Sequence, residues 1–322
     1  MSYFIFGGSG FIGTHLIALI DNLYPGTKIY NLDIVENNHE GKSTYINCDV
    51  RSEINIDIPV TSEDVIFNFA AVHRTPGHPD QAYFETNIRG AENVCAFAEK
   101  FGIKKIVFTS SIAPYGAAED LKTEETLPTP NTPYGISKLV AEKIHTIWQA
   151  KKLNERQLTI VRPGVVFGKG ENGNFTRLYW GIRGGKFFYP GRKDTIKACI
   201  YVKELVRFML YRLENHSEGV ELYNCTFESA FTIEQIVETM KKATGLQRTI
   251  VKVPGSLLMT VASIVGPLGG KALGICPARV KKLMISTNIC GKKLADSGYK
   301  FHYTFEEAIK DWYRDNDNKY LR

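Results

Sequence analysis

Tyr134 and Lys138 are the residues of this 322-residue chain whose types and spacing point most directly to chemistry. They stand four residues apart in a segment with apolar residues at helical spacing, so a helix would place both on one face. A nearby ammonium favours a phenolate, which would lower the pKa of Tyr134 and let it take a proton from a hydroxyl. Ser111 ends an apolar run and could hydrogen-bond the same oxygen. Loss of that proton, while a hydride leaves the same carbon, oxidises an alcohol.

The N-terminal segment indicates an acceptor for the hydride. An apolar run, Tyr3–Phe6, leads directly into three glycines spaced three apart, at Gly7, Gly10 and Gly13. Glycines in such a turn allow a tight reversal and a close approach of a pyrophosphate, and the following helix offers free N–H groups. Asp33 ends the next apolar run, where a carboxylate can accept hydrogen bonds from an adenosine ribose and would repel a 2′-phosphate. We therefore expect NAD rather than NADP as cofactor.

These residues need a scaffold, and the first half of the chain alternates strand-like runs with helical patterns. The expected strands are 28–34, 44–50, 65–71, 104–111 and 158–163, and the expected helices are 80–101 and 134–148. The pattern predicts an α/β fold with a Rossmann-type doubly wound parallel sheet, whose apolar strands are covered on both faces. We expect residues 1–165 to form an NAD-binding domain. Residues 166–322 would mainly form a smaller mixed α/β substrate-binding domain, with about 192–230 returning to the first.

Composition and charge narrow the classes of function. The formal net charge is +6, and no acidic residue lies between Glu238 and Asp296 while ten Lys or Arg residues do. The positive potential of such a stretch attracts phosphates, although a surface of solvated Lys and Arg side chains is the simpler interpretation. The basic stretch has no known nucleic-acid motif and no aromatic side chains among its Lys and Arg residues on which bases could stack. We therefore expect no nucleic-acid partner. The six cysteines are scattered without a Cys-x-x-Cys pair, and no secretory signal opens the chain, so we expect reduced thiols, no metal site and a cytoplasmic location.

Residues 253–270 are uncharged over nearly the length that spans a bilayer. Their glycines and prolines favour a short core helix followed by a loop. A hydrophobic lip that rests on a membrane or covers a substrate is a second interpretation, and a transmembrane span is the least favoured.

Taken together, the motifs resemble those of the extended short-chain dehydrogenase/reductases, and within them the NAD-dependent epimerase/dehydratase family that acts on nucleotide sugars. The resemblance covers essentially the whole chain and is most specific over the first 168 residues. The motifs that carry it are the three glycines, Asp33, Asp49 to Arg51, Asn68 to Ala71, Asn87, Ser110 to Gly116, Tyr134 with Lys138, and Arg162 to Gly168.

The resemblance implies roles for individual residues. Tyr134 would be the acid/base, Lys138 would tune it and bind the nicotinamide ribose, and Ser111 would contact the C4 oxygen of the substrate. Further substrate contacts would come from His73, Asn174, Arg177, Lys197 and Arg279, although a hydrogen-bonded loop histidine is an equal interpretation of His73. Cofactor contacts would come from Gly7, Gly10, Phe11, Ile12, Asp33, Asp49, Val50, Ala70, Ala71, Lys138 and Pro163.

Departures from the family pattern separate the possible activities. Ile112 and Ala113 follow Ser111 where dehydratases of the group carry Asp and Glu, which disfavours dehydration. The leading hypothesis is a UDP-hexose-type 4-epimerase that oxidises C4 transiently, and the resemblance adds a homodimer and a role in polysaccharide biosynthesis. A one-way nucleotide-4-keto-sugar reductase or dehydrogenase remains open, as does a hydroxysteroid- or dihydroflavonol-type oxidoreductase. A non-catalytic NAD sensor is the most distant alternative.

Overall fold

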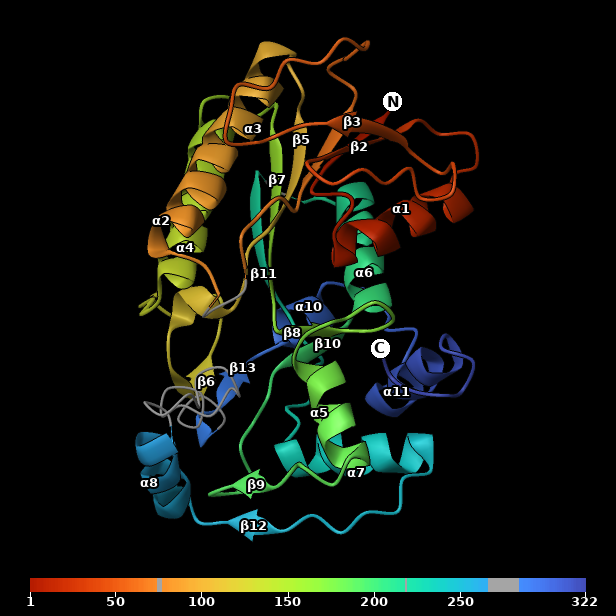
Figure 1. The fold of residues 1–322 in the computed structure, drawn as a ribbon. Helices are drawn as coiled ribbons and strands as arrows, with labels where there is room; N and C mark the ends of the chain where they lie inside the picture. The colour runs from red at the N-terminus through yellow and green to blue at the C-terminus, as the bar shows by residue number, and fades with distance from the viewer. Residues whose placement is uncertain (74–76, 218, 266–283) are drawn as a thin grey trace.

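The computed structural model describes residues 1–73, 77–217, 219–265 and 284–322 (Figure 1). At its centre is a seven-stranded sheet in which every neighbouring pair is parallel, in the order β11-β7-β5-β4-β1-β2-β3. This confirms the predicted Rossmann-type doubly wound α/β fold. The strands are β1 (Tyr3–Phe6), β2 (Ile29–Asp33), β3 (Thr44–Asn47), β4 (Val65–Asn68), β5 (Lys105–Thr109), β7 (Gln157–Pro163) and β11 (Val220–Cys225).

Helices cover both faces of the sheet (Figure 1). On one face α1 (Phe11–Leu23) and α6 (Val202–Glu214) contact each other and bury Leu16, Ile17 and Leu205 against the strands. On the other, α3 (Arg89–Lys100) and α4 (Pro133–Ala150) bury Val94, Ala98 and Trp148. Burial from both sides explains why the central strands β1 and β4 are apolar almost throughout and fully buried.

The predicted helix over residues 80–101 contains one irregularity. It is built from α2 (Asp80–Tyr83), a π-helical turn (Phe84–Ile88) and α3, which follow one another without a break. A π-helical turn inserts one extra residue into a helix and turns the neighbouring side chains by a fraction of a turn. Here it places the buried Asn87 toward α4, as described below.

A second group of elements lies beyond the carboxyl edge of the sheet, at the lower end of Figure 1. Its core is aromatic: the ring of Phe167 stacks on Phe175 at 4.8 Å and packs against Trp312. It is built from three strand pairs and five described helices. They are β6 (Ala118–Lys122) with β13 (Thr287–Ile289), β8 (Val165–Phe167) with β10 (Cys199–Tyr201), β9 (Tyr189–Pro190) with β12 (Lys252–Val253), and α5 (Asn174–Arg183), α7 (Ile233–Thr244), α8 (Gly255–Val265), α10 (Lys292–Asp296) and α11 (Phe305–Arg314).

The two halves of the sequence are interleaved in space. Although α6 and β11 come from the second half, α6 covers the seven-stranded sheet and β11 forms its edge beside β7. The expected return of about 192–230 to the first domain stays a prediction, since β10 within this range pairs with β8 outside the seven-stranded sheet. The division at residue 165 itself stays a prediction.

The described side chains of segment 253–270 do not lie in a core, which differs from the core helix that its composition favours. The first part of the segment forms α8, and the described side chains of this helix are exposed or half-buried, with Leu257 54% exposed. Residues 266–270 lie outside the described part of the chain. Within the described ranges, none of the helices combines the length and the apolar character that crossing a membrane requires.

Candidate active site

Because the strands are parallel, the residues that follow them meet at one edge of the sheet. Gly7 follows β1, Asp33 ends β2, and Ala70 lies just beyond β4. The order of the strands reverses between β1 and β4, and ligands of open α/β sheets bind in the crevice at such a point. The sequence-predicted cofactor residues therefore gather where the topology places a nucleotide.

The glycine turn is closely packed against neighbouring backbone, and side chains at Gly7 or Gly13 would collide with it. Gly7 has a φ of +77°, and a Cβ atom there would lie 2.7 Å from the backbone nitrogen of Ala70. A Cβ on Gly13 would lie 2.6 Å from the Cα of Gly8. α1 begins after Gly10 without a side-chain cap, so the N–H groups of Phe11 and Ile12 are in its uncapped first turn. These features fit a pyrophosphate on the helix N-terminus.

The carboxylate of Asp33 is held beside this turn. Its Oδ2 accepts a hydrogen bond from the backbone N–H of Ser9 at 3.0 Å, and its Oδ1 accepts one from Val35 at 3.0 Å. Each oxygen keeps a further lone pair for the hydroxyls of a ribose. This geometry fits NAD, and the fixed negative charge opposes the 2′-phosphate of NADP.

The remaining predicted cofactor residues line the same edge of the sheet, and they differ in burial and in the bonds that they already form within the protein. Val50 is buried and its carbonyl accepts a hydrogen bond from Asn93 Nδ2 at 2.8 Å, which holds the loop after β3 against α3. Asp49 is engaged by Arg51, whose Nη2 lies 2.6 Å from Asp49 Oδ2. Ala71 is half-buried beyond β4, and Pro163 is the buried last residue of β7.

Ser111 and Tyr134 come together from different elements. Ser111 follows β5, and Tyr134 lies in the first turn of α4, which Thr132 caps by accepting a hydrogen bond from the Gly135 N–H. The hydroxyl of Ser111 lies close enough to that of Tyr134 to influence its pKa. Burial raises the pKa of Tyr134, and the interaction with Ser111 offsets part of that rise. The expected lowering of the Tyr134 pKa is therefore wrong for the protein alone, because desolvation outweighs the effect of the neighbouring groups.

Lys138 lies one turn further along α4 and is 2% exposed. Its ammonium lies 4.5 Å from the centre of the Phe108 ring. Burial lowers the pKa of Lys138 to about 7, and the negative charge of Glu142 opposes this shift. Lys138 can thus change its charge near neutral pH, which an ordinary lysine cannot.

Glu142 is a residue that the sequence reasoning did not single out. It lies one turn beyond Lys138 on the same face of α4 and accepts two hydrogen bonds from Arg162, Nε to Oε1 at 2.8 Å and Nη2 to Oε2 at 2.6 Å. Ser110 also donates to Glu142 Oε1. All three side chains are buried. The repeat of four residues from Tyr134 through Lys138 to Glu142 was a signal that could have identified this residue.

Two further side chains hold α4 in place, Asn87 of the π-helical turn and His145 of α4 itself. Asn87 donates to Ser137 Oγ at 2.8 Å and to the Val72 carbonyl at 3.0 Å, and accepts from the Val72 N–H at 2.8 Å. His145 stacks on the face of Phe108 at 4.1 Å, and burial lowers its pKa to about 4. The start of α4 is therefore fixed relative to β4 and β5, which fixes Tyr134.

The described substrate candidates come from separate segments of the chain. Asn174 and Arg177 are exposed in the first turn of α5, where Arg177 Nη2 donates to Asn174 Oδ1 at 3.1 Å. Lys197 Nζ donates to the Ile285 carbonyl at 2.7 Å, so part of its hydrogen-bonding capacity is used within the protein. His73 is exposed in the loop after β4. Arg279 lies outside the described residues.

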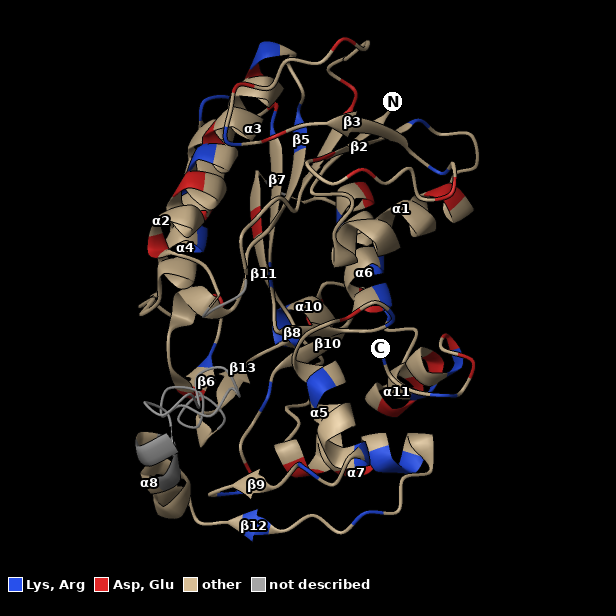
Figure 2. Ribbon diagram, in the orientation of Figure 1, with Lys and Arg blue, Asp and Glu red and all other residues tan. Residues whose placement is uncertain are grey.

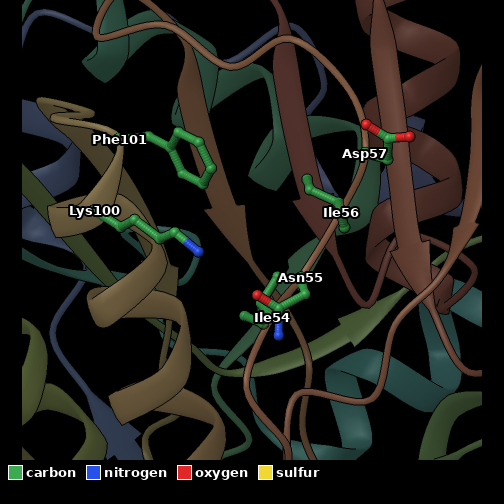
Figure 3. A pocket seen from close by; sticks show the side chains of 6 residues that line it. All are labelled: Ile54, Asn55, Ile56, Asp57, Lys100 and Phe101. Atoms are coloured by element: carbon green, nitrogen blue, oxygen red, sulfur yellow. The ribbon is translucent and has the colours of Figure 1, made fainter.

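A pocket elsewhere has no link to this chemistry. It is lined by the loop before β4 and the end of α3, beside the amino end of β5 and thus at the opposite edge of the sheet (Figure 3). Its side chains are Ile54, Asn55, Ile56, Asp57, Lys100 and Phe101. Among the described residues, no group of three or more His, Cys, Asp or Glu side chains could hold a metal ion, and the five described cysteines are free thiols.

Comparisons with known proteins agree with this site. Residues 3–226 match the "NAD dependent epimerase/dehydratase family". The chain is 32% identical over 308 residues to an N-acetyl-alpha-D-glucosaminyl-diphospho-ditrans,octacis-undecaprenol 4-epimerase of Escherichia coli O157:H7, covering 95% of this chain and 92% of the relative. It is 25% identical over 340 residues to a 3beta-hydroxysteroid-dehydrogenase/decarboxylase of Arabidopsis thaliana, covering 94% and 77%.

The fold has a close counterpart among solved structures. A UDP-N-acetylglucosamine 4-epimerase from Bacillus cereus superposes with a TM-score of 0.73 at 20% identity, over 98% of each chain. The predicted fold, cofactor and enzyme class thus agree with the glycine turn, Asp33 and the matched family. This chain belongs to the NAD-dependent epimerase/dehydratase family, and it is an NAD-dependent enzyme.

Proposed function

We propose that this enzyme interconverts the two C4 epimers of a hexose or N-acetylhexosamine that is attached to a diphosphate. The observation that carries the proposal is the grouping of Ser111, Tyr134 and Lys138 beyond the carboxyl end of β5, in a chain whose glycine turn fits NAD. A group that exchanges a proton with a hydroxyl, beside a hydride acceptor, is what transient oxidation of an alcohol requires.

The residues have distinct parts in this reaction. Tyr134 takes the proton of the C4 hydroxyl and later returns it to the ketone oxygen, while Ser111 hydrogen-bonds the same oxygen. Lys138 supplies positive charge that favours the phenolate form of Tyr134. NAD held by the glycine turn and Asp33 would supply a reversible acceptor for the C4 hydride. Because proton and hydride are both returned, the reaction has no net redox change, and return to the other face of the ketone inverts C4.

Two groups are candidates for the other end of the diphosphate, a nucleotide and a polyprenol. The sequence motifs favour a nucleotide-linked sugar of the UDP-hexose type, whereas the Escherichia coli relative is named for a sugar on undecaprenyl diphosphate. A diphosphate is common to both, and cationic side chains suit it. Arg177, Lys197 and Arg279 are the proposed clamp, with Asn174 and His73 as polar contacts.

A product assay without added nicotinamide tests the reaction. The enzyme is incubated with UDP-glucose, UDP-N-acetylglucosamine and the undecaprenyl-linked N-acetylglucosamine, and the sugars are separated by chromatography. Formation of a C4 epimer at sub-stoichiometric enzyme supports the proposal, because retained NAD closes the cycle. Product that forms only when NAD or NADH is supplied indicates the one-way reductase or dehydrogenase instead.

Tyr134→Phe tests the acid/base role. We expect turnover to fall by about 100-fold or more, since general acid–base catalysis contributes at that scale. Retained NAD, measured after denaturation, should be unchanged. Tyr83→Phe is the matched control, because its ring lies 6.2 Å from that of Tyr134 and it loses the same hydroxyl. Equal activity of both variants would refute the assignment.

A second candidate is oxidation of an apolar alcohol such as a hydroxysteroid. It is favoured by the Arabidopsis thaliana relative and by the exposed apolar α8. UDP distinguishes the candidates, because a nucleotide-sugar site binds it and raises the melting temperature, whereas a steroid site does not.

The assembly and location also belong to the proposal. Ile136, Val140 and Ile147 are 40%, 36% and 60% exposed on one face of α4, at spacings of four and seven residues. We expect this stripe to pair with a second copy in a homodimer. The free thiols of the described cysteines favour a cytoplasmic location.

A further inference from the structure

The end of the molecule farthest from the seven-stranded sheet carries an exposed apolar surface. Phe188 and Val251, which precede the paired strands β9 and β12, are 37% and 61% exposed, and Leu257 of α8 is 54% exposed. Tyr189 N–H donates to the Val251 carbonyl at 2.9 Å, so the first two residues are held side by side. We call Phe188, Val251 and α8 the apolar tip (Figure 1).

The helix of the tip is apolar almost all round, yet it lies on the surface. The sequence of α8 has no charged residue, and none of its described side chains is buried. A helix of this character normally lies in a core or in contact with lipid. Two of the hydroxyls of α8 bond back to its own backbone, Thr260 to the Ser256 carbonyl at 3.0 Å and Ser263 to the Met259 carbonyl at 2.8 Å. These hydroxyls therefore need no water when the helix enters an apolar medium.

Unpaired positive charge surrounds the tip. Lys186 and Lys252 are exposed, and no described carboxylate forms an ion pair with either. The nearby carboxylates are already neutralised, since Lys193 pairs with Glu234 at 2.7 Å and Arg192 with Glu119 at 2.7 Å and Asp194 at 3.5 Å. Figure 2 shows basic residues on β12 and its approach, and none of either sign on α8.

We propose that the apolar tip docks on the surface of a lipid bilayer that contains anionic headgroups. An apolar helix flanked by exposed Lys side chains lies in the interface plane, with its apolar side chains at the acyl boundary and the ammonium groups at the phosphates. α8 has 11 residues, about 16 Å of helix, which is too short to cross a bilayer. Docking at the interface is therefore the arrangement that its length and charges allow.

Sedimentation of the full chain with vesicles tests this inference without measuring turnover. Large vesicles of phosphatidylcholine alone are compared with vesicles that also contain phosphatidylglycerol. We expect the protein to bind the anionic vesicles, more weakly at high salt because screening weakens the lysine contacts. Leu257→Glu should weaken binding at least about tenfold, or about 1.4 kcal/mol. Lys252→Gln should weaken it less and reduce its salt dependence.

Leu153→Glu is the matched control, because Leu153 is 65% exposed in the turn after α4, at the amino edge of the sheet. It should bind vesicles as the unchanged protein does, and all variants should keep the same melting temperature. Three results would overturn the inference: no binding to anionic vesicles, equal loss in both Leu variants, or equal binding to neutral vesicles. Loss of self-association in Leu257→Glu without vesicle binding would assign the tip to a second copy of the chain. The assay is independent of the proposed function, which the product assay tests by itself.

Discussion

At the scale of single residues, the proposed chemistry of this enzyme depends on groups that burial has moved away from their ordinary pKa. Tyr134 is a weaker acid than a free tyrosine, and the pKa of Lys138 falls to about 7. Both shifts come first from desolvation, which disfavours the charged form of each group. The negative charge of Glu142, which forms a buried pair with Arg162, opposes the shift of Lys138.

Lys138 should make the stability of the nucleotide-free protein depend on pH. Between pH 7 and about 10 the unfolded chain keeps a proton on Lys138 that the folded chain has released, so the free energy of unfolding rises with pH. The contribution approaches about 1.4 kcal/mol for each pH unit. Urea denaturation of the unchanged protein and of Lys138→Met at pH 7 and pH 9 measures it. Only the unchanged protein should gain this stability, and parallel profiles would contradict the buried site.

Glu142→Gln should destabilise the fold strongly. It leaves the buried guanidinium of Arg162 without its carboxylate, and breaking a buried pair in this way costs about 3–5 kcal/mol. Glu99→Gln is the control, because its 2.8 Å pair with Lys151 is exposed and contributes less than about 1 kcal/mol. Chemical denaturation compares the two. A loss in Glu142→Gln as small as that of the control would show that the pair is not structural.

At the scale of elements, the turn between β1 and α1 is packed too closely at Gly7 to accept a side chain, and we propose that it positions the cofactor. Gly7→Ala places a methyl group 2.7 Å from the Ala70 nitrogen. We expect the variant to lose retained NAD and to be destabilised by more than the strain of a positive φ, which is about 1–2 kcal/mol. Gly26→Ala is a matched control, because its φ is +82° and nothing lies within 4 Å of the new Cβ.

The nucleotide content and melting temperature of both glycine variants measure the effect. Gly26→Ala should carry the backbone strain alone and keep its NAD. If both variants lose equal stability and both keep NAD, the close packing of the turn against Ala70 has no part in holding the cofactor.

At the scale of the whole molecule, two exposed apolar surfaces lie on different parts of the fold. One is the stripe on α4, and the other is the apolar tip beyond the sheet. Exposed apolar surfaces of this kind mark interfaces. They are far enough apart in the fold for a dimer and a membrane contact to form independently (Figure 1).

Ile147→Glu should dissociate the proposed homodimer. A charge on the most exposed residue of the α4 stripe would be buried without a partner, and we expect dimerisation to weaken by about 100-fold, or about 2.7 kcal/mol. Leu23→Glu is the control, because Leu23 is 50% exposed at the end of α1 on the opposite face of the sheet. Analytical ultracentrifugation measures both. An unchanged molecular mass for Ile147→Glu would place the interface elsewhere.

The sequence alone determined the order of the elements and the identity of the glycine turn, because these depend on local patterns. The predicted strand 28–34 contains β2, and the expected helix 134–148 lies within α4. The glycine spacing between a strand and a helix, together with Asp33 at the end of the next strand, allowed the cofactor to be predicted as well.

Only the tertiary structure decided which charges lie close together and which apolar segments remain exposed. Glu142 and Arg162 are twenty residues apart in sequence and meet only because α4 crosses the end of β7. The same packing desolvates Tyr134 and reverses the expected direction of its pKa. Composition cannot distinguish an apolar helix inside the protein from one on its surface, so α8 was expected in a core. Burial and electrostatics are properties of the packed chain, and local sequence does not contain them.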